Sequence, residues 1–338
     1  MKKEIYYTIC PVANATYLAA NHGFLKQGLG AIGYEPIRLQ TLSPDKWSAH
    51  FTYKNDRLFR EGGNTPPLWA KSRGEGVVLI GLNLIESKQS ILVRADSGIQ
   101  TIEQLKGKRL AIPAHTNVSI DFHKATAEQA FEIALEANGI RKEDVRWVTV
   151  ENPHSFSSEG KEEERKGGLN LLSEAEVEAL DKGEVDAIFE KLPIVEQLIF
   201  TGRYRKIYDV AFDQQDIEPV NNEYPNVLTV SKRLAEEEPE VVVEFLKQTI
   251  LAARWAKTHQ EEAEKLLAEQ THGTVEEYQR SFADGFYQRL EPNFSEKGLR
   301  TLQKRADFLY EHGYLESEVD VYQWADDSFL KKALNELQ

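Results

Sequence analysis

The chain contains one cysteine, Cys10, at the end of a short segment with the pattern of a strand. In residues 4–10, aromatic and β-branched side chains follow Glu4 and alternate between two faces, which predicts a strand that Pro11 ends. Helical spacing begins at Asn14. Ligands of open parallel sheets bind where strands end, and unpaired N–H groups at a following helix start would favour a thiolate. Cys10 is therefore a candidate reactive thiol, although a lone cysteine is more often a small core residue.

A second segment, residues 50–68, carries groups suited to an anionic substrate. Arg60 presents a planar fork that matches an anion with two oxygens. The Gly62-Gly63 pair can present backbone N–H groups without obstruction by side chains, and His50 can transfer protons near neutral pH. The same pattern also fits a helix with surface charges followed by a tight turn, so the spacing alone leaves both interpretations open.

Thr8 and Tyr53 are placed to orient these groups. Thr8 lies on the same face of the predicted strand as Cys10, because side chains along a strand alternate in direction. Tyr53 follows His50 within the second segment. We expect both side chains to orient the thiol and the substrate.

Two other patterns are weaker candidates. The glycines of residues 28–33 spell G-x-G-x-x-G, but they follow a predicted helix and precede a predicted strand, the reverse of the dinucleotide-binding fingerprint. We interpret them as glycines that end a helix. His115 and His123 lie near Asp121, but their spacing matches no common metal motif. Solvated or hydrogen-bonded histidines are the favoured interpretation, and no metal is predicted.

Strand and helix patterns alternate along most of the chain, which predicts an α/β fold with parallel sheets in two lobes and helices appended. After residues 4–10, the predicted strands are 35–42, 77–82, 90–93, 109–112, 145–150 and 185–189. Helices are predicted from Asn14, around 68–70, at 120–138 and 174–181, and through nearly everything from Ser231 onward, while 45–60 is helical or mixed.

Residues 159–168, EGKEEERKGG, predict a solvated loop, with a mobile lid as the alternative. Among the C-terminal helices, the aromatic residues Phe282, Phe286 and Trp324 are expected in the core and not at a ligand.

Composition narrows the class of protein. The 338 residues are 41% hydrophobic and 28% charged, a globular balance with room for two domains. The net charge of −14 makes nucleic acid an unfavourable partner. No apolar run is long enough to span a membrane and no export signal is visible, so we expect a cytoplasmic protein. One cysteine excludes an internal disulfide and a cysteine-rich zinc site, and the scarcity of sulfur fits either thermostability or sulfur economy.

Several segments together resemble the aryl sulfinate desulfinases of the dibenzothiophene desulfurisation pathway. The resemblance is carried by residues 7–15 (YTICPVANA), 50–53 (HFTY) and 60–68 (REGGNTPPL), and it continues through 107–112, 183–187, 282–290 and 320–334. It spans nearly the whole chain, and it is specific because three separate segments must agree.

The resemblance implies a two-lobed fold of the periplasmic-binding-protein type (type II) with additional C-terminal helices, and an enzyme without a cofactor. Lobe one would comprise residues 1–97 and 222–338, and lobe two residues 98–221, with the substrate between the lobes. On the matching positions, the resemblance implies the catalytic residues Cys10, His50 and Arg60 and the motif glycine Gly63. Together with the residues singled out above, the expected substrate-binding residues are Gly63, Gly62, Thr8 and Tyr53.

The implied reaction is hydrolysis of an aryl sulfinate, 2'-hydroxybiphenyl-2-sulfinate or a close analogue, to a phenol and sulfite. Arg60 and the Gly63 N–H would hold the sulfinate oxygens. Cys10 would act either as a thiolate that attacks sulfur or as a thiol that protonates the ring carbon, and the sequence does not choose between them. The aryl sulfinate is the expected partner and a monomer is expected, although nothing in the sequence fixes the oligomeric state.

Two regions depart from that family. Residues 121–146 match poorly, are shorter and lack an expected tryptophan, and the insertion at 159–168 has no clear counterpart. Because both belong to the predicted second lobe, which would shape the aryl pocket, the exact substrate stays open. Two alternatives therefore remain: a binding protein for a sulfonate, sulfinate or thiamine precursor that performs no chemistry, and a desulfinase for another aryl sulfinate.

Overall fold

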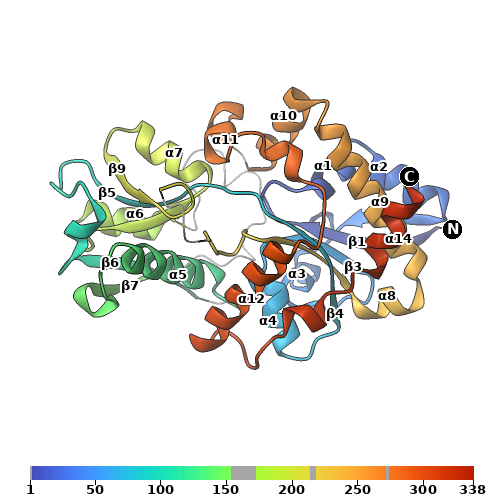
Figure 1. Ribbon diagram of the computed structural model, residues 1–338, viewed down its shortest axis with the longest axis horizontal. Helices are drawn as coiled ribbons and strands as arrows, with labels where there is room; N and C mark the ends of the chain where they lie inside the picture. The colour runs from blue at the N-terminus through green and yellow to red at the C-terminus, as the bar shows by residue number, and fades with distance from the viewer. Residues whose placement is uncertain (1, 117, 154–172, 214–217, 272–273) are drawn as a thin grey trace. The chain divides into compact units, whose positions relative to one another are not determined.

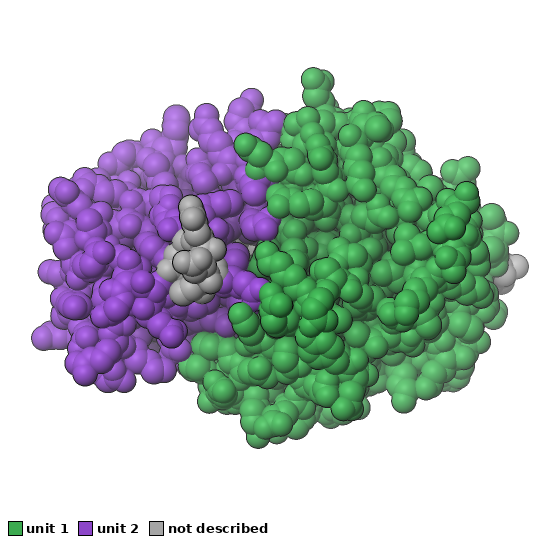
Figure 2. All heavy atoms as spheres, in the orientation of Figure 1, with its two compact units in different colours: residues 1–85, 222–275, 284–338 green, residues 86–221, 276–283 purple. Residues whose placement is uncertain are grey.

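The computed structural model describes residues 2–116, 118–153, 173–213, 218–271 and 274–338. The chain forms two compact units, which Figure 2 shows in different colours: unit 1 contains residues 1–85, 222–275 and 284–338, and unit 2 contains residues 86–221 and 276–283. The chain returns to unit 1 at residue 222, the position that the resemblance implied for the return to lobe one. It leaves unit 1 after residue 85, earlier than the predicted residue 97.

The earlier crossover follows from the pairing of β5 (Gln89–Arg94). This strand pairs on both sides within unit 2, with β8 (Ile188–Lys191) and with β9 (Tyr204–Asp209). Residues 276–283 also cluster with unit 2, because Lys88 N–H donates to Ser281 O at 2.7 Å. The predicted first lobe therefore loses both the β5 strand and this short C-terminal stretch.

Unit 1 is built on a five-stranded sheet in the order β2-β1-β3-β10-β4. The strands are β1 (Lys3–Ile9), β2 (Tyr34–Arg38), β3 (Leu58–Gly62), β4 (Val77–Asn83) and β10 (Asn226–Ser231). β1 runs parallel to β2 and β3, whereas β10 is antiparallel to both β3 and β4. The sheet is therefore mixed, and the prediction of a wholly parallel sheet is wrong because β10 enters it from the returning chain.

β3 is a strand that the sequence pattern did not predict. Within the segment read as helical or mixed, the helix α3 is confined to Ala49–Thr52, and residues 58–62 form a fully buried strand. A strand between two others has both faces covered, so it reads as an apolar run, but Arg60 and Glu61 interrupt that run here. The missing apolar signal is thus the reason for the error.

Helices cover both faces of this sheet, as Figure 1 shows. They are α1 (Ala15–Asn21), α2 (Phe24–Ala31), α4 (Thr65–Ser72), α8 (Lys232–Glu237), α9 (Pro239–Ala256), α10 (Gln260–Thr271), α12 (Glu296–Glu311), α13 (Val321–Trp324) and α14 (Ser328–Glu336). The amphipathic α9 contacts α1, α2 and α14, and Phe245 on it stacks on Phe59 with ring centroids 3.9 Å apart. Phe286 and Trp324 are buried in the core as predicted.

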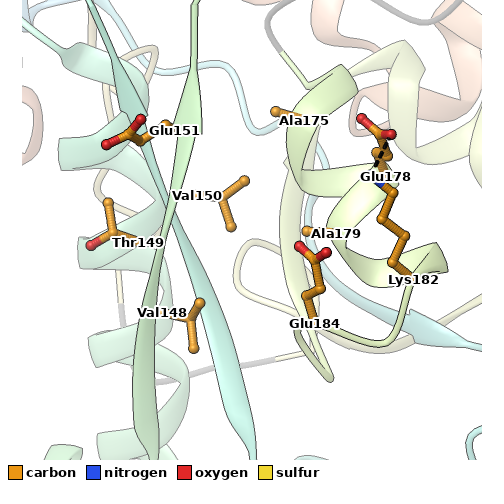
Figure 3. Close-up of a pocket in the computed structure, with 9 residues that line it drawn as sticks. All are labelled: Val148, Thr149, Val150, Glu151, Ala175, Glu178, Ala179, Lys182 and Glu184. Atoms are coloured by element: carbon orange, nitrogen blue, oxygen red, sulfur yellow. Dashed lines mark ion pairs between the residues drawn. The ribbon is translucent and has the colours of Figure 1, made fainter.

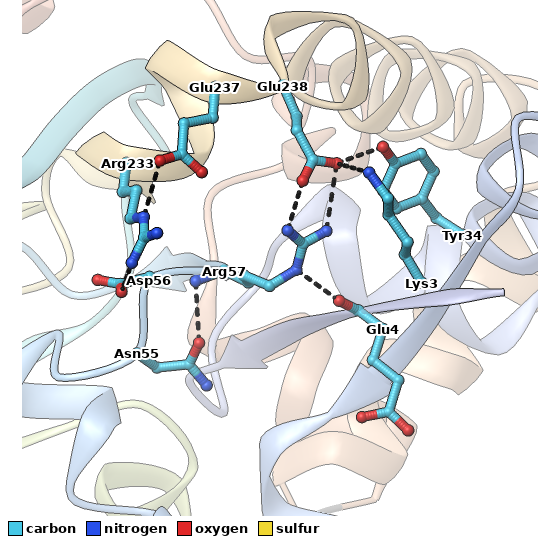
Figure 4. Close-up of polar contacts among 9 residues, drawn as sticks. All are labelled: Lys3, Glu4, Tyr34, Asn55, Asp56, Arg57, Arg233, Glu237 and Glu238. Carbon is cyan, nitrogen blue, oxygen red and sulfur yellow. Dashed lines mark hydrogen bonds and ion pairs between the residues drawn. The ribbon is translucent and has the colours of Figure 1, made fainter.

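A polar network ties the start of β3 to its neighbours (Figure 4). Arg57 donates from Nε to Glu4 O at 2.7 Å and from Nη1 to Glu238 Oε1 at 2.5 Å. Glu238 also accepts from Tyr34 Oη and lies 3.6 Å from Lys3 Nζ. The hydrogen bonds from Arg57 hold the pKa of Glu238 at about 2. Residues from β1, β2 and the junction of α8 with α9 thus fix the strand that carries Arg60.

Unit 2 contains a three-stranded sheet in the order β8-β5-β9 and a parallel pair, β6 (Arg109–His115) with β7 (Arg146–Asn152). A bridge between Leu110 and Ala187 connects the two. The helices are α5 (Phe122–Ala137), α6 (Glu174–Asp181), α7 (Pro193–Phe200) and α11 (Val275–Ser281), which crosses the unit boundary. β5 is antiparallel to both neighbours, so this sheet also differs from the parallel prediction.

The predicted loop or lid at residues 159–168 lies outside the described residues. Within the described part of the chain, the helices are too short or too polar to cross a bilayer.

Candidate active site

Cys10 follows β1 directly, and its sulfur meets two of the predicted site residues. Sγ lies 3.3 Å from Arg60 Nη2 and 3.6 Å from His50 Nε2. The backbone fixes this position, because Cys10 N–H donates to Glu61 O at 3.0 Å across to the neighbouring strand β3. Cys10 is only partly buried. The structure therefore brings the three predicted catalytic residues together around the sulfur of a partly buried cysteine.

Arg60 is buried, with 1% of its surface exposed, and most of its donors are committed within unit 1. Nε donates to His50 O at 3.1 Å and Nη1 to Gly63 O at 2.7 Å. These two bonds hold the guanidinium so that Nη2 faces the Cys10 sulfur. A buried cation next to a sulfur favours the thiolate over the thiol. Arg60 is thus arranged first as the charge partner of Cys10.

His50 is neutral in this arrangement. Its ring nitrogens lie against Arg60, Thr8 and Cys10, so loss of hydration and then the Arg60 charge hold the pKa of His50 well below its usual 6.5. Nε2 lies 3.3 Å from Arg60 Nη2, and a guanidinium can only donate. Nε2 must therefore carry the lone pair, which leaves the proton on Nδ1. The lone pair also faces the thiol and can accept its proton.

Thr8 completes this proton arrangement, together with a residue that the sequence analysis missed. Thr8 Oγ1 is 2.8 Å from His50 Nδ1 and accepts from Gln40 Nε2 at 2.7 Å. With both neighbours donating to its hydroxyl, Thr8 holds the His50 tautomer in place. Gln40 lies two residues beyond the end of β2 and belongs to no motif, so no sequence signal could have identified it.

The two motif glycines make room for other side chains. A Cβ on Gly62 would lie 2.2 Å from Cys10 Sγ, and a Cβ on Gly63 would lie 2.2 Å from Asn222 Nδ2. The sequence suggested that Gly62 belongs to a turn, but in the structure Gly62 is the last residue of β3. Within the described part of the chain, nothing accepts a hydrogen bond from the Gly63 N–H. A buried N–H without an acceptor beside Arg60 is suited to an anionic ligand.

Tyr53 lies against Arg60 from the far end of α3. Its backbone is left-handed, with φ of 55°, and its hydroxyl lies 2.5 Å from Thr229 Oγ1. Thr229 in turn donates to Arg60 O at 3.2 Å. Burial raises the pKa of Tyr53 to about 12, so the hydroxyl stays protonated. Tyr53 therefore supports the strand that carries Arg60, and its hydroxyl is held by Thr229.

The helix starts near Cys10 do not offer the free N–H groups that the sequence suggested. At α1, Thr16 N–H donates to Glu61 Oε2 at 2.7 Å and Tyr17 N–H to Asn14 Oδ1 at 2.7 Å. This part of the sequence argument is wrong, because side chains of unit 1 already occupy the position expected for a thiolate. Glu61 is the responsible residue and was not a predicted site residue.

The start of α4 is closed in a similar way. Asn64 N–H donates to Asn222 O and Thr65 N–H to Asn222 Oδ1. Pro66 and Pro67 follow, and proline has no N–H. Near Arg60, the Gly63 N–H is thus available to a ligand, whereas the N–H groups at the start of α4 are bonded to Asn222 or are absent in the prolines.

Unit 2 contains a separate cluster of buried ionisable side chains. His115 Nδ1 lies 3.1 Å from Asp121 Oδ1, in agreement with the expected hydrogen-bonded histidine. Glu190 accepts from Ser173 Oγ at 2.7 Å, while Glu176 Oε2 and Glu190 Oε1 have no partner within the described residues. Burial raises the pKa of Glu176 to about 7. Burial and then Glu176 raise the pKa of Glu190 well above its usual value.

A pocket of about 240 Å³ lies between β7 and α6 in the same unit (Figure 3). Val148 and Val150 point into it from the strand, and Ala175 and Ala179 from the helix, as the figure shows. None of the predicted site residues lines this pocket.

Comparison with known sequences finds similarity to both an enzyme and a binding protein. A family model described as "NMT1/THI5 like" matches residues 64–161. The 2'-hydroxybiphenyl-2-sulfinate desulfinase of Rhodococcus erythropolis is 28% identical over 359 residues, covering 99% of this chain and 94% of that enzyme. A putative aliphatic sulfonates-binding protein of Bacillus subtilis (strain 168) is 26% identical, covering 83% of this chain and 74% of that protein.

Comparison with solved structures gives the same picture. A mutant of the desulfurisation enzyme DszB in complex with biphenyl-2-sulfinic acid superposes with a TM-score of 0.78 at 25% identity, covering 99% of this chain and 100% of that chain. The periplasmic aliphatic sulphonate binding protein SsuA of Escherichia coli superposes with a TM-score of 0.66 at 17% identity, covering 96% and 98%. The predicted α/β fold of the periplasmic-binding-protein type is therefore confirmed.

Proposed function

We propose that this chain is a cofactor-free desulfinase that hydrolyses an aryl sulfinate, such as 2'-hydroxybiphenyl-2-sulfinate or a close analogue, to a phenol and sulfite. The observation that carries the proposal is the buried Arg60 guanidinium, 3.3 Å from both the Cys10 sulfur and the His50 ring. A protein that only binds an anion needs the cation but not a thiol and a proton acceptor beside it. Similarity to a sulfinate desulfinase supports the same assignment.

The donors around Arg60 suit a small oxyanion. Two of its nitrogens hold backbone carbonyls, and Nη2 lies 3.3 Å from both the Cys10 sulfur and His50 Nε2. A ligand that replaces one of these Nη2 contacts would meet this donor beside the Gly63 N–H. Side chains and prolines close both neighbouring helix starts, as described above. Two donors match the two oxygens of a sulfinate, and their charge stabilises the departing sulfur group.

Two routes use the same groups and give the same balanced reaction, in which a sulfinate anion and water yield the arene and hydrogen sulfite. In the first, the Cys10 thiol protonates the ring carbon, the carbon–sulfur bond breaks, and sulfur dioxide leaves and is hydrated. In the second, the Cys10 thiolate attacks sulfur, the ring carbon takes a proton, and water releases sulfite from a thiosulfonate-like adduct. In both, the neutral His50 ring accepts or returns the thiol proton.

The decisive experiment incubates the protein with a panel of aryl sulfinates and measures sulfite release. We expect turnover of at least one aryl sulfinate, and a loss of about a thousandfold or more in Cys10→Ser, because the reacting group is removed while the fold is kept. Mass spectrometry of quenched reactions distinguishes the two routes, since only the second leaves a covalent adduct on Cys10. Full turnover by Cys10→Ser would contradict both routes.

The rival function is binding without chemistry, which the similarity to sulfonate-binding proteins favours. Calorimetry with the same sulfinates and with alkanesulfonates tests it directly. Tight binding of a sulfonate with no sulfite from any sulfinate would establish the rival and overturn the proposed desulfinase.

A further inference from the structure

Glu61 contacts both ends of the loop that carries Cys10. Its backbone oxygen accepts from Cys10 N–H at 3.0 Å, where the loop leaves β1. Its side-chain Oε2 accepts from Thr16 N–H at 2.7 Å, where the loop enters α1. Residues 10–16 therefore start and finish at a single residue of β3, which is also the neighbour of Arg60 in the chain.

The Glu61 carboxyl has no role in the chemistry described above. It is buried, with 1% of its surface exposed, and side chains alternate along a strand, so it lies on the opposite face of the sheet from Arg60. Its register partners are Ile9 on β1 and Leu228 on β10, and α1 presents the Ala15 and Thr16 N–H groups. None of these four residues carries a charged side chain, and within the described part of the chain the hydrogen bonds that reach the carboxyl come from the start of α1.

We infer that Glu61 is a positioning residue for Cys10: its carboxylate anchors the start of α1, and its backbone anchors Cys10, so that the thiol stays beside Arg60. The inference rests on the proposed role of Cys10 as the reacting group. Burying an acid is costly, and an apolar side chain would fill the same space in the strand. The positioning role explains why an acid stands at this place, which neither the fold nor the reaction does.

The strength of this anchor depends on pH. Burial raises the pKa of Glu61 to about 7, while the bonds from Thr16 and Ala15 oppose that rise. Above that pH the carboxylate accepts charge-assisted hydrogen bonds, which are stronger than those to a neutral acid. Placement of Cys10 should therefore tighten as the pH rises through the neutral range.

Alkylation by iodoacetamide tests the inference without any sulfinate, because the thiolate displaces iodide and Cys10 is the sole cysteine. Glu61→Gln keeps an acceptor for Thr16 but cannot ionise. We expect its alkylation rate to equal that of the wild type at about pH 6 and to be about fivefold lower at about pH 8, where the wild type is ionised. Glu35→Gln on β2, whose side chain is 43% exposed, is the matched control and should show no change.

A rate ratio between Glu61→Gln and the wild type that is the same at both pH values, or a variant that reacts faster, would overturn the inference. A merely structural role would lower the thermal midpoint without giving the ratio a pH dependence. Lack of any alkylation of the folded wild type would also count against it, because Cys10 is only partly buried and its place beside Arg60 is argued to favour the reactive thiolate. If alkylation behaves as expected but no sulfinate is turned over, the positioning role stands and the proposed function fails.

Discussion

In unit 1 the buried Arg60 guanidinium lies 3.3 Å from the sulfur of Cys10. In unit 2, by contrast, burial and then the neighbouring carboxyl of Glu176 raise the pKa of a second carboxyl, that of Glu190. Both clusters take ionisable side chains out of water, which is costly unless the charge is compensated. Unit 1 compensates with a partner of opposite sign. Unit 2 compensates by keeping a proton, even though Lys191 lies close enough to lower the pKa of Glu190.

The two solutions have different chemical consequences. Opposite charges favour the ionised thiol and fix its place, and the neighbouring His50 is kept neutral as a proton acceptor. Two carboxyls that share a buried space keep one or both protons into the neutral range, so their ionisation affects stability. We therefore expect changes in unit 1 to act mainly on turnover and changes in unit 2 to act mainly on the pH dependence of unfolding.

Among the variants that keep the Cys10 thiol, the largest effect is expected from Arg60→Lys, which keeps a positive charge but loses the guanidinium contacts that place it beside the sulfur. A lysine cannot hold His50 O, Gly63 O and the sulfur at the same time, because it lacks the planar fork. We expect sulfite release to fall by about a hundredfold or more. The ultraviolet absorbance of the thiolate should appear only at higher pH than in the wild type.

Arg305→Lys is the matched control for that change. Arg305 is also fully buried in unit 1, and it donates to Thr65 Oγ1 at 2.9 Å rather than to the thiol. It should lower the thermal midpoint and leave the thiolate absorbance unchanged. If the two variants shifted the absorbance equally, Arg60 would not be the charge partner of Cys10.

A smaller effect is expected from Thr8→Val, which tests whether proton placement belongs to the unit 1 arrangement. Valine keeps the shape of threonine but cannot accept from His50 Nδ1 or Gln40 Nε2. The His50 ring then loses the contact that fixes its tautomer, and we expect a fall in kcat of about tenfold to a hundredfold. Thr249→Val serves as control, because the hydroxyl of Thr249 donates to Phe245 O within α9. An unchanged kcat in Thr8→Val would remove Thr8 from the proton arrangement.

The sequence predicted much of this site because its chemistry is concentrated in three short segments. Cys10, His50 and Arg60 were identified from residue type and from resemblance, and the strand before Cys10 follows from its alternation. β3 was missed because two charged residues interrupt its apolar run. Alternation of apolar and polar residues identifies a strand with one buried face. It does not identify a strand such as β3, in which charged side chains are buried as well.

The sequence did not predict which residues from distant segments contact the site residues. Gln40 acts through Thr8, and Asn222 lies where a Cβ on Gly63 would be. The helix start at α1 was expected to face the thiol, but Glu61 takes its N–H from the neighbouring strand. Each of these contacts depends on strand order, which local spacing does not encode.

The smallest expected effect comes from Glu190→Gln, which tests the unit 2 side of the comparison. The pKa of Glu190 in the folded protein is raised, so the folded state binds more protons than the unfolded state above about pH 4.5. Stability from this group is therefore present at low pH and is lost as the pH rises through its folded pKa. We expect the wild-type thermal midpoint to fall between about pH 5 and about pH 8, and the fall to be smaller in Glu190→Gln.

Glu178→Gln on the neighbouring helix gives the contrast that makes this measurement specific. The Glu178 side chain is 60% exposed and pairs with Lys182 at 2.7 Å, so its removal should leave the slope against pH unchanged. An equal slope in all three proteins would mean that the carboxyls of Glu176 and Glu190 are compensated by charge, as in unit 1.

Because Glu61 also titrates near pH 7, a residual slope in Glu190→Gln is expected. The double variant with Glu61→Gln should flatten it further, since the two groups lie in different units and their effects should add.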